Sequence, residues 1–194
     1  MTAFGVHVIT VPFAALFHTI PEVPQDYGGV NVLSRMLDGL GFRYRWATDG
    51  LVAEDLAFTP GQGAMTLGEL MLHLRQLVCW VSVNVQASRD GREAVAWSDA
   101  CAHLPEVGND ASALSGQVLL SIATLRGDLL AMGDAELPKV RLLASSGPDH
   151  RPFWNAINGP LSDFLTHVGQ VNAWRRMMGK PGPPIDVFRG EPKE

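Results

Sequence analysis

The sequence predicts an all-α fold, a four-helix bundle with long crossover connections. Four segments carry apolar residues at steps of three and four, the spacing that turns one helix face toward a core. Clusters of glycine and proline separate these segments, and the connection after the third is long. The chain has 194 residues, 46% of them hydrophobic and 18% charged, which suits one folded domain. A bundle is the economical way to bury four such faces.

The first helix is expected over residues 30–44. Gly39 and Gly41 weaken its end. A long connection over residues 47–64 then closes on the breakers Pro60, Gly61 and Gly63. The apolar face of this helix consists of Leu33, Met36, Leu37 and Leu40.

The second helix is expected over residues 67–86. Thr66 and Glu69 stand at the spacing of a capping box, in which each side chain satisfies a free backbone N–H of the other residue. The polar tract 88–93 ends the helix. Its buried stripe is predicted to be Leu70, Leu74, Leu77, Val81 and Val85.

The third helix is expected to begin at a cap, either Asp110 or Ser112, and to end at Gly133. Residues 134–151 are then expected to form a crossover loop, in which residues 139–143 could be a short extended piece. The apolar positions of the helix follow a regular rhythm: Ala111, Leu114, Val118, Ile122, Leu125, Leu129 and Met132.

The fourth helix is expected to open at or just before Asn158, because a proline at position 160 suits a first helical turn. It should end at Gly179, before a proline-rich stretch. Residues 1–29 then form an N-terminal arm packed on the domain, residues 30–184 the bundle, and residues 185–194 a C-terminal tail.

Composition excludes some partners. The net charge of −5 and the pI near 5.6 oppose a general nucleic-acid binder, because such a surface repels the phosphate backbone. The apolar run over residues 6–20 is too short for a membrane span and lacks a basic leader, so an arm is favoured over an export or membrane signal. An exposed apolar run over residues 6–17, together with the flat faces of the bundle, favours a homodimer. Two cysteines without C-x-x-C spacing indicate a reducing compartment, the cytoplasm.

Three residues are candidate metal ligands. His73 falls on the inward side of the second helix, although a lone inward histidine is more often a satisfied core residue. Asp163 and His167 are four residues apart, which stacks them about 6 Å apart on one face of the fourth helix. Asp163 could instead complement the helix dipole, and His167 could simply bond a backbone group. A metal would satisfy all three polar groups in a bundle interior.

These segments resemble a known family. Residues 59–74, T-P-G-Q-G-A-M-T-L-G-E-L-M-L-H-L, are similar to the second-helix motif of the DinB/YfiT-like superfamily, where a proline-rich turn leads into a helix with one metal-binding histidine. Residues 163–170, D-F-L-T-H-V-G-Q, followed by Arg175, Arg176, Gly179 and Pro181, are similar to its last helix. The usual pattern there is H-x-x-x-H, and here Asp163 replaces the first histidine.

The resemblance implies a divalent-metal protein with open coordination positions. His73, Asp163 and His167 suit zinc, nickel, iron or manganese. Some relatives are thiol-dependent transferases, which implies transfer of a low-molecular-weight thiol to a small electrophile, in detoxification or stress. Two alternatives stay open, namely a metal-dependent hydrolase and a non-catalytic bundle that binds a metal or small ligand. The expected partner is therefore a small molecule.

Further residues are candidates for the surroundings of the metal. Glu69 could orient His73, although its capping role explains it already. Gln170 could donate to a ligand. Trp80, Asn84 and Trp174 could line a pocket over the metal, or simply fill the core. Cys79 is expected to be a buried structural cysteine.

Overall fold

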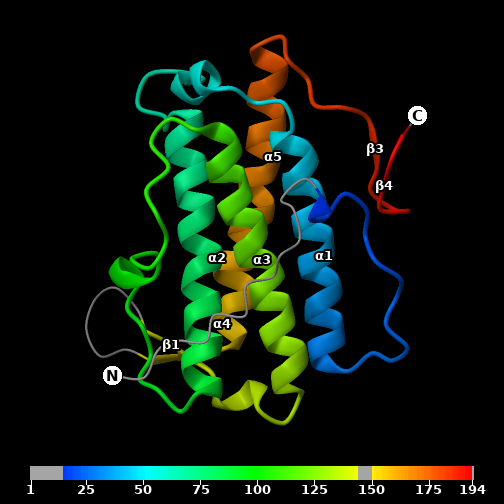
Figure 1. The fold of residues 1–194 in the computed structure, drawn as a ribbon, viewed down its shortest axis with the longest axis vertical. Helices are drawn as coiled ribbons and strands as arrows, with labels where there is room; N and C mark the ends of the chain where they lie inside the picture. The colour runs from blue at the N-terminus through cyan, green and yellow to red at the C-terminus, as the bar shows by residue number, and fades with distance from the viewer. Residues whose placement is uncertain (1–14, 144–149, 194) are drawn as a thin grey trace.

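The computed structural model describes residues 15–143 and 150–193, and this part of the chain is all-α apart from two small strand pairs. Four long helices lie side by side in Figure 1. They are α1 (Gly29–Thr48), α2 (Leu67–Arg89), α3 (Ala111–Met132) and α5 (Ser162–Met177).

The connections carry the shorter elements. Single 3-10 turns occupy Ala53–Ala57, Trp97–Asp99 and Leu137–Lys139, and the short helix α4 (Trp154–Ala156) precedes a π turn, Ile157–Leu161. Strand β1 (Arg141–Leu143) pairs antiparallel with β2 (His150–Pro152), and β3 (Ile185–Asp186) pairs in the same way with β4 (Glu191–Pro192).

One apolar core holds the four helices together. The expected stripes of α2 and α3 are buried except for Met132, which is only partly buried. Helices α1 and α5 add Leu37, Tyr44, Phe164 and Val171. Burying a side chain of this size contributes about 1.5–3 kcal/mol. No helix in the described part of the chain has both the length and the apolar character to cross a membrane.

Helix α1 runs four residues past its expected end at residue 44, to Thr48. Gly41 does not weaken the helix end but opens a packing site. A Cβ atom at position 41 would lie 2.5 Å from the Cγ atom of Phe17, so only glycine admits this ring. The glycine that suggested a helix end is therefore explained by the segment that packs against α1.

Helix α5 begins later than the expected Asn158, at Ser162. The backbone of Gly159 is non-helical (φ −100°, ψ −108°) and Pro160 follows it, so the chain bends within the π turn before the helix proper starts. Asp163 consequently lies in the first turn of α5.

Residues 1–14 and 144–149 lie outside the described residues. The homodimer predicted from residues 6–17 therefore stays a prediction, as do the first half of the arm and residues 144–149 of the loop expected over residues 134–151. The described end of the arm reaches the C-terminal strand pair, because the backbone N–H of Ile20 donates to the carbonyl of Gly190 at 2.8 Å. Of the extended piece expected at residues 139–143, residues 141–143 form β1, whereas Lys139 ends a 3-10 turn.

The expected capping box begins α2. The Thr66 hydroxyl accepts from the Glu69 N–H at 3.2 Å, and the Glu69 carboxylate accepts from the Thr66 N–H at 2.7 Å. Replacing Thr66 with Ala is expected to lower the free energy of unfolding by about 1 kcal/mol, measured by urea denaturation. Ser112→Ala is the control, because the cap of α3 is Asp110 and not the exposed Ser112. An equal loss in both variants would contradict a specific cap at Thr66.

Candidate metal centre

Two helices bring the three candidate ligands together. His73 lies on α2, whereas Asp163 and His167 lie one turn apart on α5. The Nε2 atom of His73 is 3.3 Å from one carboxylate oxygen of Asp163, and Nε2 of His167 is 3.4 Å from the other. The two imidazole rings meet edge to face, with centroids 5.1 Å apart.

These distances fit a shared ion. Ligand atoms at about 2.1 Å from a tetrahedral ion are about 3.4 Å apart. One ligand atom from each of His73, Asp163 and His167 can be chosen so that all three lie within 4.8 Å of one another. Three protein donors leave at least one position for another molecule, the arrangement of catalytic rather than structural sites. The group can therefore hold a metal ion.

The site is partly open to solvent. The side chain of His73 is 27% exposed, that of Asp163 46% and that of His167 17%. A half-exposed carboxylate in the first turn of a helix is also favourable without an ion, because it complements the helix dipole. Asp163 is thus placed both to complement the helix dipole and to ligate an ion.

Gln170 contacts a candidate ligand directly. Its side-chain oxygen lies 2.7 Å from Nδ1 of His167. When Nδ1 carries the proton and donates to this oxygen, Nε2 keeps a free lone pair directed at Asp163. Such a contact fixes the tautomer and the orientation of a ligating imidazole.

Gln170→Ala is therefore expected to weaken metal binding by about 10- to 100-fold. Isothermal titration calorimetry of the metal-free protein with zinc measures this change. The matched control is Gln86→Ala, which removes a glutamine of α2 that bonds Asp128 rather than a ligand or a neighbour of one. Unchanged affinity in Gln170→Ala would exclude an orienting role for Gln170.

Trp97 is a neighbour of the site that the helical patterns did not predict. Its ring centroid lies 6.1 Å from that of His73 and 5.4 Å from that of Trp80. Trp97 belongs to a 3-10 turn between α2 and α3, where no helical periodicity marks an inward position. Trp80 is thus connected to the site through Trp97, and its Nε1–H donates to the carbonyl of Leu143 at 3.1 Å.

Asn84 serves the connection after α2 instead of the metal. Its amide group donates to the carbonyl of Val95 at 3.0 Å and accepts from the N–H of Val95 at 2.8 Å. It lies eleven residues beyond His73, or about 16 Å along the helix axis. Asn84 therefore anchors the chain that leads to Trp97.

Two other candidates have partners elsewhere. The carboxylate of Glu69 is bonded to Thr66, which supports the capping interpretation rather than orientation of His73. The ring of Trp174 packs against Phe58 with centroids 6.4 Å apart. These contacts direct Glu69 and Trp174 toward Thr66 and Phe58 rather than toward the three candidate ligands.

The two cysteines lie next to one another but apart from the three ligands. Cys79 is 1% exposed, as expected for a structural cysteine. The thiol of Cys101 donates to the carbonyl of Arg75, one turn before Cys79, at 3.7 Å. A hydrogen bond between the two thiols lowers the pKa of Cys79 and raises that of Cys101. Among the described residues, neither cysteine belongs to the metal-binding group.

Comparison with known proteins gives no match among family models, curated proteins or solved structures.

Proposed function

We propose that this chain is a DinB/YfiT-like four-helix bundle that binds a divalent metal and transfers a low-molecular-weight thiol to a small electrophile. The observation that carries the proposal is the cluster of His73, Asp163 and His167, whose ligand atoms lie within 4.8 Å of one another at a partly exposed position. Three donors and an accessible face suit an ion that takes a further ligand from solution.

The order of the motifs supports the family assignment. A Pro-Gly turn and a capping box lead into α2, and His73 follows on the second turn of that helix. The last long helix carries Asp163 and His167, followed by Gly169 and Gln170. This is the order expected of the superfamily, with an aspartate in place of one histidine.

Each side chain has a distinct role in the proposed reaction. His73, Asp163 and His167 hold the ion, and Gln170 orients one imidazole. A bound divalent ion supplies Lewis acidity, which lowers the pKa of a thiol and keeps it as a thiolate near neutral pH. The ring of Trp97 offers an apolar surface beside His73 for the carbon skeleton of the electrophile.

The sulfur nucleophile is expected to come from a cosubstrate. Cys79 is buried, and the thiol of Cys101 is directed at a carbonyl of α2. In the reaction, the cosubstrate sulfur forms a bond to carbon, the leaving group departs with its electron pair, and the thiol proton passes to solvent.

A two-histidine, one-carboxylate donor set suits zinc, nickel, iron or manganese.

The test combines metal analysis with an activity screen. Protein purified without chelator or affinity tag is analysed for metals, and the loaded protein is then assayed with several thiols against small electrophiles. Metal uptake with thiol-dependent product supports the transferase. Hydrolysis of esters or amides without added thiol would favour the hydrolase. A chain that takes up no divalent ion would be a non-catalytic bundle.

Asp163→His tests the ligand set more sharply. This variant restores the commoner family pattern and is expected to retain one ion per chain while shifting preference toward metals that favour imidazole. Competition between manganese and nickel, followed by elemental analysis, measures the shift. A variant with the same metal preference as the unmodified chain would argue against Asp163 as a ligand.

A further inference from the structure

A cleft lies on the far side of α5 from the candidate metal centre. Its volume is about 520 Å³, within the range of small-molecule sites. At about 100° per residue, Leu165, Gly169 and Arg176 project from the face of α5 opposite to Asp163 and His167. The cleft is bounded by α1, α5 and the chain after α5, and it is lined by Arg43, Trp46, Ala47, Leu165, Val168, Gly169, Asn172, Arg176, Pro181, Gly182, Pro183, Pro184, Ile185 and Val187.

The walls of this cleft are built into the fold. Arg175 is 6% exposed, and its guanidinium donates to the carbonyls of Ala47 at 2.9 Å and Lys180 at 2.9 Å. These bonds fix the start of the C-terminal segment against α1. A Cβ atom on Gly182 would lie 3.0 Å from the carbonyl oxygen of Trp46, so glycine lets the segment approach the helix closely.

One part of the cleft is apolar. Leu165 is 47% exposed although it is a large aliphatic residue, and Val168 forms the buried part of the wall beside it. The indole of Trp46 is held in place, because its Nε1–H donates to the carbonyl of His18 at 3.2 Å. These side chains offer a preformed surface to an apolar body.

The other part of the cleft is cationic. Arg43 from α1 and Arg176 from α5 both line it, and no aspartate or glutamate does. Most arginines of this acidic chain have acceptors; Arg126, for example, is paired with Asp38. Within residues 15–143 and 150–193, the side chains of Arg43 and Arg176 have neither a hydrogen bond nor an ion pair. Two unpaired guanidinium groups beside an apolar wall favour an anionic ligand.

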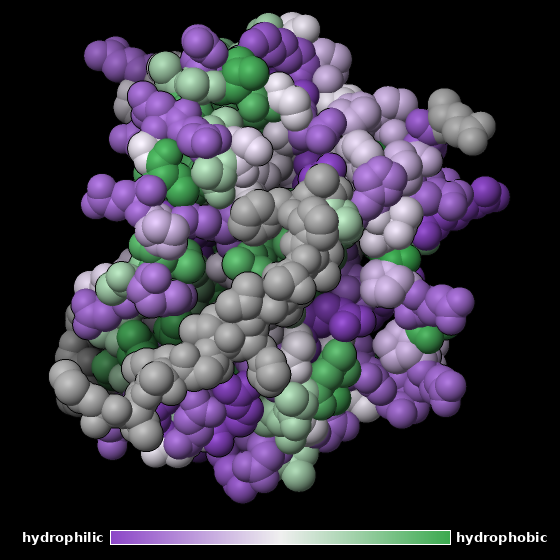
Figure 2. All heavy atoms as spheres, viewed as in Figure 1, coloured by the Kyte–Doolittle hydropathy of each residue, from purple (hydrophilic) through white to green (hydrophobic). Residues whose placement is uncertain are grey.

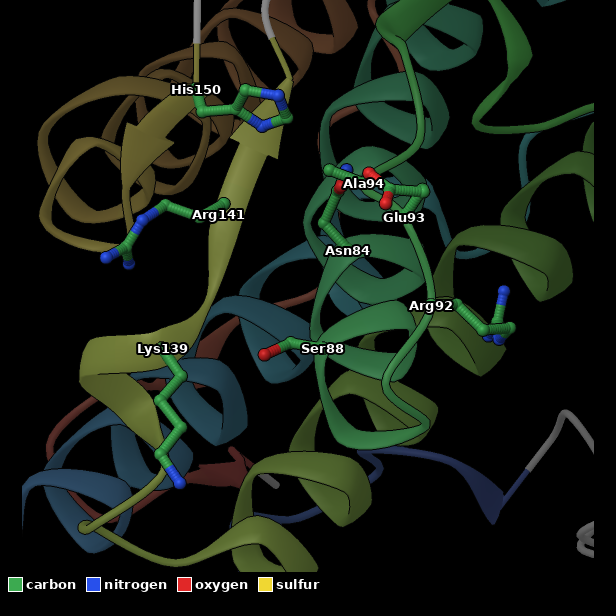
Figure 3. A pocket seen from close by; sticks show the side chains of 8 residues that line it. All are labelled: Asn84, Ser88, Arg92, Glu93, Ala94, Lys139, Arg141 and His150. Carbon is green, nitrogen blue, oxygen red and sulfur yellow. The ribbon is translucent and has the colours of Figure 1, made fainter.

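Another cleft, about 310 Å³ and located beside α2, lacks these properties (Figure 3). The side chains of Arg92 and Arg141 point away from one another there, and Glu93 contributes a negative charge. Lys139 is bonded to Glu136. The cationic groups of this cleft therefore do not converge on one ligand position.

We propose that the cleft between α1 and α5 binds a small amphipathic carboxylate. The carboxylate lies between Arg43 and Arg176, whose planar guanidinium groups bind a carboxylate through paired hydrogen bonds. The apolar body of the ligand covers Trp46 and Leu165. This site is independent of the metal centre and of the proposed transferase activity.

The test uses 2-naphthoate as probe and 2-naphthamide as its uncharged counterpart, both titrated by calorimetry into the full chain. Naphthoate is expected to bind at one site per chain, and naphthamide at least about tenfold more weakly. Arg43→Gln and Arg176→Gln are each expected to weaken naphthoate binding by about tenfold or more, with little effect on naphthamide. Arg92→Gln, in the other cleft, is the matched control and should leave binding unchanged.

A further variant separates this site from the metal centre. His167→Ala should bind naphthoate as the unmodified chain does, because the carboxylate does not reach the metal centre. Equal binding of naphthoate and naphthamide, loss of binding in His167→Ala, or no saturable binding at millimolar concentration would each overturn the proposal. The comparison of naphthoate with naphthamide uses the unmodified chain, so it tests the need for a carboxylate even if an arginine substitution impairs folding. A change of oligomeric state in Arg43→Gln or Arg176→Gln, without loss of naphthoate binding, would identify the cleft as a contact between chains.

Discussion

His167→Ala is expected to reduce metal affinity by more than about 100-fold, because removing a ligand costs more than removing the group that orients it. His167 supplies one of three donors, and the remaining His73 and Asp163 hold an ion far less tightly. Elemental analysis and zinc titration of the purified variant measure the loss. Any thiol-transfer activity of the chain should disappear with the metal.

The same substitution should leave the fold intact. The helices are held by the apolar core rather than by an ion, so the free energy of unfolding of the metal-free protein should change by less than about 1 kcal/mol. His103→Ala is the matched control, since His103 is exposed in the connection between α2 and α3. Full metal occupancy in His167→Ala would remove the ligand assignment, and unfolding of the chain on metal removal would indicate a structural ion instead.

The second large effect is expected in the core beside the site. Phe164 is 1% exposed, and its ring lies 5.6 Å from that of Tyr44, which is fully buried on α1. Phe164→Ala deletes the ring and leaves a cavity between α1 and α5. The expected loss in free energy of unfolding is about 3–5 kcal/mol, measured by urea denaturation.

The adjacent residue provides the control for this loss. Leu165 is 47% exposed, so Leu165→Ala should cost far less, about 0.5 kcal/mol or below. The two variants remove apolar side chains from adjacent positions, about 100° apart around α5, of which only Phe164 faces the core. Comparable losses would mean that α5 does not present Phe164 to the core as described.

Local chemistry made the course of α2 and α3 predictable from the sequence. The signals that end these helices lie within four residues of each end. They are the capping box at Thr66, the cap at Asp110 and the glycine at position 133, and the structure has a helix end at each of them. The juxtaposition of His73 with Asp163 could also be expected, because inward residues of neighbouring helices meet. Ligation itself remains a prediction.

Features that depend on distant packing were not predictable. Gly41 reads as a helix breaker until Phe17, 24 positions earlier in the chain, is seen to occupy the space of its missing side chain. Trp97 lies in a connection, and its position beside His73 depends on bonds from Gln76 and Asn84 to the surrounding chain. The later start of α5 depends on how Gly159 bends the chain before Pro160.

Because the candidate ligands lie on two different helices, a bound ion would affect the stability of the folded chain. His73 and Asp163 are 90 positions apart in the sequence, so an ion held by both would be a reversible cross-link that forms only in the folded chain. Such an ion stabilises the native state according to its free concentration, by about 2.7 kcal/mol at 100 times its dissociation constant. The melting temperature of this chain would thereby report how much free metal surrounds it.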